Sequence, residues 1–144
     1  MGKTKTVKRQ VRKPKRMTPW LGLPKNFNPS EFEGFVYLIT CLKTNKKYIG
    51  RKYFWKGRPR KKARKESDWQ YYKSSSLDLI RDIELSGIES FRFEILTVCK
   101  TRAETNYTEI REQFIRDVLY SLLPSGEYEY YNGCVLNRYY RRTK

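Results

Sequence analysis

The segment 34–53 reads GFVYLITCLKTNKKYIGRKY, and it decides the fold that this sequence predicts. Residues 35–40 are β-branched, aromatic or otherwise apolar, and residues 47–53 include two tyrosines and an isoleucine, a composition that favours β-strands. The polar residues 43–46 between them have the composition of a turn. The segment therefore predicts an antiparallel hairpin.

The chain after the hairpin contains both helical and strand patterns. We expect a short helix over residues 66–72 and another over residues 77–85, with an N-cap among the serines at 74–76 and an end at Gly87. Residues 91–98 alternate between apolar and polar side chains, which predicts a third strand.

A long helix is predicted over residues 103–122, capped by Thr101. Its apolar stripe should comprise Tyr107, Ile110, Phe114 and Val118. The expected order is β-β-α-β-α, which describes an α+β fold with a small three-stranded antiparallel sheet flanked by helices.

The flanking segments differ from this domain in composition. Residues 1–16 are expected to form a flexible basic arm, and residues 17–33 an extended, proline-rich lead-in held against the domain by residues such as Trp20. The folded domain itself should span residues 34–137, followed by a basic tail at 138–144.

The net charge of +17 predicts a polyanionic partner, because neutralising phosphates releases counterions. Three segments (1–16, 51–65 and 138–144) hold 21 of the 32 basic residues and no acidic ones, so the remaining 11 bases face all 15 acids. A near-neutral body with basic patches is typical of a nucleic-acid-binding surface. The candidate DNA contacts are Lys52, Lys56, Arg60, Lys61, Lys62, Arg64, Lys65 and Lys73.

Several classes of protein are excluded by composition. The sequence has no histidine, which rules out a catalytic histidine or a histidine metal ligand. Three widely spaced cysteines predict free thiols in a reducing compartment and no zinc site. Without a long apolar run or a secretory signal, the expectation is a cytoplasmic protein with no membrane contact.

Two short motifs on the predicted hairpin resemble those of the GIY-YIG endonuclease family. Residues 34–37 (Gly-Phe-Val-Tyr) stand where the family has Gly-Ile-Tyr, and residues 48–50 match its Tyr-Ile-Gly letter for letter. The second tyrosine follows Tyr37 by eleven residues, which is the family's hairpin spacing. The resemblance extends to Asn132 and is greatest with small phage-encoded, homing-endonuclease-like members, which implies a phage-infected bacterial host.

This resemblance implies a DNA endonuclease that uses one glutamate-bound divalent ion, expected to be Mg²⁺. Tyr37 would be the general base or would orient the water, and Tyr48 would support it. The phosphate-stabilising arginine would be Arg58 or Arg51.

The metal ligand would be Glu109 or Glu112, both on the long helix, and Asn132 would position water or phosphate. Helical geometry leaves the choice between the two glutamates open.

Two other functions fit the same composition. One is a non-catalytic basic nucleic-acid-binding protein, and the other is a degenerate GIY-YIG domain that serves only as an interaction module. We expect no separate DNA-recognition region after Asn132, so specificity should come from the basic segments, from a homodimer on DNA or from a partner protein.

Overall fold

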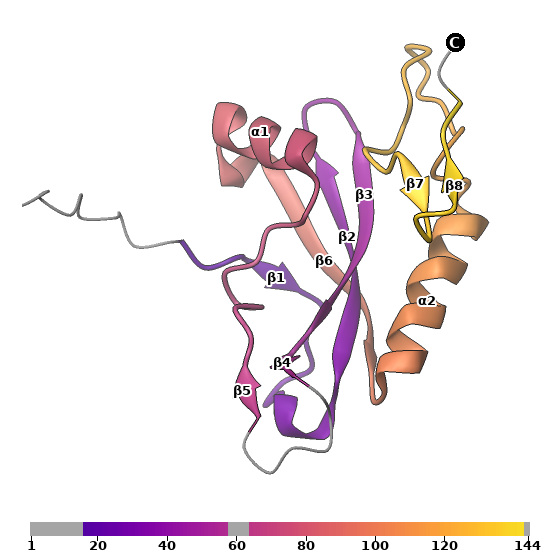
Figure 1. Ribbon diagram of the computed structural model, residues 1–144. Helices are drawn as coiled ribbons and strands as arrows, with labels where there is room; N and C mark the ends of the chain where they lie inside the picture. The colour runs from indigo at the N-terminus through magenta and orange to yellow at the C-terminus, as the bar shows by residue number, and fades with distance from the viewer. Residues whose placement is uncertain (1–15, 58–63, 143–144) are drawn as a thin grey trace, which may run out of the picture.

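The structure is a computed structural model that describes residues 16–57 and 64–142. Within these ranges, the main sheet contains four strands in the order β1-β6-β2-β3. They are β1 (Trp20–Leu21), β2 (Gly34–Cys41), β3 (Lys47–Tyr53) and β6 (Phe91–Cys99). Helix α1 (Leu77–Ser86) lies on one side of the sheet and α2 (Arg102–Ile115) on the other (Figure 1). The predicted α+β fold and the hairpin are confirmed, because β2 pairs antiparallel with both β3 and β6.

Shorter elements complete the fold. β4 (Trp55–Lys56) and β5 (Lys65–Glu66) pair as an antiparallel ribbon, and β7 (Cys134–Val135) pairs with β8 (Tyr139–Tyr140). Single 3-10 turns occur at η1 (Pro29–Glu31) and η2 (Ile88–Ser90). None of the described helices combines the length and apolar character needed to cross a membrane.

The predicted lead-in contributes to the folded body. Its strand β1 runs parallel to β6, an edge strand that the prediction of a three-stranded antiparallel sheet lacked. The Trp20 ring packs against Phe35 and Tyr37 at centroid distances of 5.1 and 5.2 Å. Its indole nitrogen also donates to the Trp69 carbonyl at 3.0 Å. Aromatic packing therefore holds a proline-rich segment that has little regular structure.

The predicted helix over residues 66–72 is wrong. Glu66 belongs to β5, and the chain then forms turns around Trp69. The buried indole ring of Trp69 packs edge-on against Phe54 at 5.0 Å and donates to the Glu66 carboxylate at 2.7 Å. Because such a short helix is barely stable by itself, these contacts decide the conformation.

The long helix begins as predicted, with the Thr101 hydroxyl accepting from the Glu104 amide, but it ends at Ile115 rather than at 122. Asp117 adopts a left-handed conformation with φ 50°, which redirects the chain. Val118 and Leu119 then enter the core from a turn rather than from a helix.

The predicted apolar stripe of this helix is only partly correct: Ile110 packs against the core and Val118 is buried, but the stripe fails at its two aromatic residues. Tyr107 is 66% exposed and Phe114 is exposed too, whereas Thr105, Thr108 and Gln113 are buried. The helix lies close to the sheet at Gly34, where an added Cβ would meet the Thr105 side chain at 3.0 Å. Small polar side chains fit this narrow space, so the larger apolar ones face outward.

Alternating side chains of β2 fill a core on each side of the sheet. Phe35, Tyr37 and Ile39 belong to the core beneath α1, and Val36 and Leu38 to the core on the α2 side. The predicted N-cap and end of α1 are confirmed, since the Ser76 hydroxyl accepts from the Leu79 amide and Gly87 closes the helix.

Gly50 on β3 lies directly opposite Tyr37 on β2. A Cβ at residue 50 would come within 2.4 Å of the Tyr37 hydroxyl oxygen and 2.8 Å of a Tyr48 ring carbon. Glycine is therefore the residue that lets both tyrosine rings lie over the β3 backbone.

We predict that Gly50→Ala lowers the free energy of unfolding by about 1–3 kcal/mol, because the added methyl group displaces packed rings. Urea unfolding followed by tyrosine and tryptophan fluorescence measures this change. Gly133→Ala is the matched control, since an added Cβ there meets nothing within 4 Å. Equal stability of the two variants would contradict the assigned contact.

Candidate active site

A cleft of ≈ 360 Å³ opens along β3, at the edge of the main sheet. Its described lining comprises Tyr37, Tyr48, Arg51, Lys52, Tyr53, Trp55, Lys56, Ser67, Asp68, Tyr72, Ser75 and Glu109. Because β3 is an edge strand, side chains from both faces of the sheet reach this cleft. Tyr48 and Gly50 lie on the face toward α1, and Arg51 lies on the face toward α2.

The tyrosines of the two motifs lie together, with ring centroids 6.1 Å apart. Tyr37 is 1% exposed and lies behind Tyr48, which is only partly buried and whose hydroxyl oxygen is 3.4 Å from that of Ser75. Burial raises the pKa of both phenols, and the neighbouring tyrosines add to this effect for Tyr37. Both side chains are therefore neutral phenols at pH 7.

Glu109 and Arg51 form an ion pair across the cleft, with 3.0 Å between Nη1 and Oε1. The Glu109 side chain is only 14% exposed. Burial raises the pKa of this carboxyl, although Arg51 acts in the opposite direction. The carboxylate is thus held in a partly dehydrated position where a cation is favoured.

The other glutamate candidate lies elsewhere. Glu112 accepts from Arg116 one helical turn later, at 3.1 Å, and does not line the cleft. Of the two glutamates, the structure brings Glu109 to the tyrosines and leaves Glu112 in a contact within its own helix.

Asn132 is buried behind the second tyrosine motif. Its side-chain oxygen accepts from the Ile49 amide at 3.1 Å, and its side-chain nitrogen donates to the Ile49 carbonyl at 2.8 Å. Asn132 therefore holds the outer edge of β3, as a neighbouring strand would. It also lines a second hollow of ≈ 400 Å³, which shares Tyr48, Arg51 and Glu109 with the cleft.

The candidate DNA contacts lie in different surroundings. Lys56 lines the cleft, and Lys56 and Lys65 are exposed on the β4–β5 ribbon. Lys52 pairs with Asp68 at 2.7 Å, and Lys73 donates to the Arg16 and Tyr71 carbonyls. Arg64 forms an ion pair with Glu33. The DNA-contact candidates Arg60, Lys61 and Lys62 lie outside the described residues, as does Arg58, the alternative phosphate-stabilising arginine.

Sequence patterns did not identify several residues that line the cleft. Tyr53 lies two residues after Arg51 on the same face of β3, so strand periodicity could have placed it there. Its hydroxyl accepts from Arg51 Nε at 3.4 Å and donates to Asn106 at 2.6 Å. Tyr72 and Ser75 come from irregular backbone, for which no periodic signal exists.

The oxygen atoms in the cleft fit a hard divalent cation. Among the described residues that line it, Glu109 and Asp68 supply carboxylates, and Tyr48 and Ser75 supply hydroxyls. The described part of the chain holds no group of three or more acidic, cysteine or histidine side chains that could enclose a metal.

Comparison with known proteins identifies the family of the chain. The family model described as "Putative endonuclease segE, GIY-YIG domain" matches residues 17–135. No curated protein and no solved structure matches the chain. The matched region contains the hairpin, both tyrosine motifs and α2, and it covers most of the sequence. The resemblance seen in the sequence is confirmed, and the chain belongs to the GIY-YIG endonuclease family.

Proposed function

We propose that this chain is a metal-dependent endonuclease that hydrolyses DNA phosphodiester bonds in the cleft along β3. The observation that carries the proposal is the convergence of Tyr48, Arg51 and Glu109 on one open cleft. Family membership supports the reaction class, and the net charge of +17 supports a polyanionic substrate.

Glu109 is the residue we assign to the divalent ion, which we expect to be Mg²⁺. The bound ion would stabilise negative charge that develops on the scissile phosphate. The partial burial of Glu109 strengthens its interaction with any nearby cation, because less water screens the carboxylate. Glu112 lacks this position and serves as its control.

Tyr48 is the better placed of the two tyrosines to contact the attacking water. It is partly exposed in the cleft, whereas Tyr37 lies buried behind it. Since burial raises the pKa of both phenols, we assign Tyr48 to orienting the water through a neutral hydroxyl rather than to acting as a phenolate base. Tyr37 would then support the Tyr48 ring by packing against its buried side.

Arg51 is assigned to the phosphate oxygens. Its guanidinium faces the cleft, paired with Glu109 and stacked 5.5 Å from the Tyr53 ring centroid. A planar fork of donors in this position suits a phosphate that develops charge. Arg58 remains the alternative from the sequence.

We predict that Glu109→Gln reduces Mg²⁺-dependent cleavage of supercoiled plasmid DNA by at least about 100-fold, because a neutral amide stabilises the ion poorly. Glu112→Gln makes the same chemical change on the same helix and should cleave within about threefold of the unchanged chain.

Binding of the plasmid without any metal-dependent cleavage, in the unchanged chain, would reject the proposal in favour of a non-catalytic DNA-binding protein. Equal loss in the two glutamine variants would reject the assignment of Glu109 alone.

A second prediction separates the tyrosines. Tyr48→Phe should lower kcat by about 100-fold while leaving DNA affinity unchanged, because it removes one hydroxyl that orients the reacting groups. Tyr37→Phe should act mainly on stability, at a cost of about 1–3 kcal/mol, since its hydroxyl is buried beside the polar groups of Tyr72 and Ser74.

Single-turnover cleavage and urea unfolding of both phenylalanine variants provide the two readouts. A larger drop in the cleavage rate for Tyr37→Phe than for Tyr48→Phe, with both variants folded, would reverse the two roles.

A further inference from the structure

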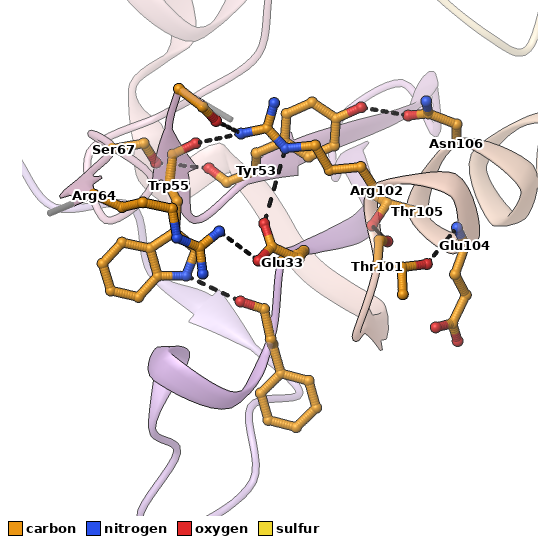
Figure 2. Close-up of polar contacts among 12 residues, drawn as sticks. Glu33, Tyr53, Trp55, Arg64, Ser67, Thr101, Arg102, Glu104, Thr105 and Asn106 are labelled. Carbon is orange, nitrogen blue, oxygen red and sulfur yellow. Dashed lines mark hydrogen bonds and ion pairs between the residues drawn. The ribbon is translucent and has the colours of Figure 1, made fainter. Parts of the chain in front are cut away.

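A cluster of charged side chains lies beside the cleft, centred on Glu33 (Figure 2). One carboxylate oxygen of Glu33 pairs with Arg64, and the other lies 3.8 Å from Arg102 Nε. The Glu33 side chain is 12% exposed, and its second oxygen and Arg102 Nε have no hydrogen-bond partner within the described ranges. These charges are thus largely removed from water.

The cluster holds both sides of the β4–β5 ribbon. Arg102 donates to the carbonyls of Trp55, at 3.2 Å, and of Gly57, on the β4 side. Arg64 immediately precedes β5, and its guanidinium lies 5.1 Å from the Trp55 ring centroid (Figure 2). Glu33 therefore connects the two sides of the ribbon: it pairs with Arg64, which precedes β5, and with Arg102 of α2, which contacts the β4 side.

The same cluster ties the ribbon to the helix that carries Glu109. Arg102 is the first residue of α2, directly after the N-cap Thr101, and Glu109 lies seven residues later in the same rigid helix. Arg102 also lies 4.5 Å from the centroid of Tyr53, which contacts Arg51. A shift of the ribbon relative to the cleft therefore requires breaking this cluster.

The ribbon itself indicates why it needs such a support. Its register places Lys56 directly opposite Lys65, and like charges in that arrangement repel each other. An anion beside the two ammonium groups would relieve this repulsion. Both lysines are exposed, and Lys56 lines the cleft. A phosphate backbone that passes through the cleft is the ligand suited to this pair.

Stability alone does not explain the cluster. Removing charges from water costs free energy that ion pairing only partly returns, so a buried cluster of this kind is weak support for a claim of stabilisation. Its geometry instead fixes where two repelling lysines are held relative to Glu109.

We propose that Glu33 and Arg102 are positioning residues for DNA binding: they hold the β4–β5 ribbon so that Lys56 and Lys65 contact phosphates next to the cleft. The inference rests on the proposed DNA substrate, but not on catalysis. The expected change in DNA affinity of one variant is opposite to the change that its charge alone would cause. Glu33→Gln removes a negative charge, which by electrostatics alone would tighten DNA binding, whereas loss of positioning weakens it.

The test measures binding of a short mixed-sequence DNA duplex by fluorescence anisotropy, in EDTA and over a range of salt concentrations. Glu33→Gln should bind about eightfold more weakly at 0.1 M salt for each phosphate that the ribbon no longer neutralises, and the slope of log K against log salt should fall by about 0.9 per phosphate. Glu31→Gln is the matched control, because it removes an exposed carboxylate two residues away. This control should bind as tightly as the unchanged chain or slightly more tightly.

Arg102→Lys keeps the net charge and provides a second variant, since lysine has one terminal nitrogen and cannot face Glu33 and the Trp55 and Gly57 carbonyls together, as Nε and Nη2 of the guanidinium do. It should show the same weaker binding and lower slope. In the background of Lys56→Gln and Lys65→Gln, Arg102→Lys should weaken binding little further, because the ammonium groups that it positions are already absent.

Binding by folded Glu33→Gln or Arg102→Lys that is as tight and as salt-dependent as that of the unchanged chain would overturn the proposal, as would full additivity with the lysine substitutions. Should Glu33→Gln fail to fold in urea-unfolding controls, Arg102→Lys decides alone. Because binding is read without metal, a chain that binds DNA but never cleaves it would refute the proposed activity and leave this test intact.

Discussion

The contact between the Tyr37 ring and the backbone of Gly50 sets the geometry of the whole cleft. It depends on the hairpin register, which pairs these residues directly, and on the missing side chain at residue 50. Asn132 secures the same strand from outside through both hydrogen-bonding groups of Ile49. The edge of β3 is consequently fixed from two directions, which is what a site built from phenol and guanidinium groups requires.

The cleft also depends on α2, whose small polar side chains face the sheet. Thr105 and Thr108 fill the narrow space under α2, and Glu109 on the same helix then reaches the cleft around the edge of β3. A helix with its large apolar residues turned inward would stand further from the sheet, because Gly34 leaves room only for small side chains. The outward position of Tyr107 and Phe114 is thus the consequence of the short distance between α2 and the sheet at Gly34.

Local patterns predicted the parts of the structure that depend on local physics. β-branched and aromatic composition located β2 and β3, alternation located β6, and capping chemistry located the start of α1 and α2. Periodicity placed Ile110 correctly on α2 but failed at Tyr107 and Phe114, because burial there follows the narrow space at Gly34 rather than hydrophobicity. The turn around Trp69 and the charged cluster centred on Glu33 depend on contacts between distant segments, which a single sequence does not reveal. The candidate tyrosines were recognisable only because their spacing resembles a known family.

The charges of the site follow one physical rule at two places. At Glu109 and at Glu33, a carboxylate is withdrawn from water and faces guanidinium groups, so its charge is satisfied within the protein. The two places differ in what else can approach. Glu109 borders an open cleft, where another cation can compete with Arg51 for the carboxylate, whereas Glu33 is enclosed between Arg64 and Arg102. Access, rather than the type of charge pair, therefore separates the carboxylate that we propose for metal binding from the one that we propose to position the ribbon.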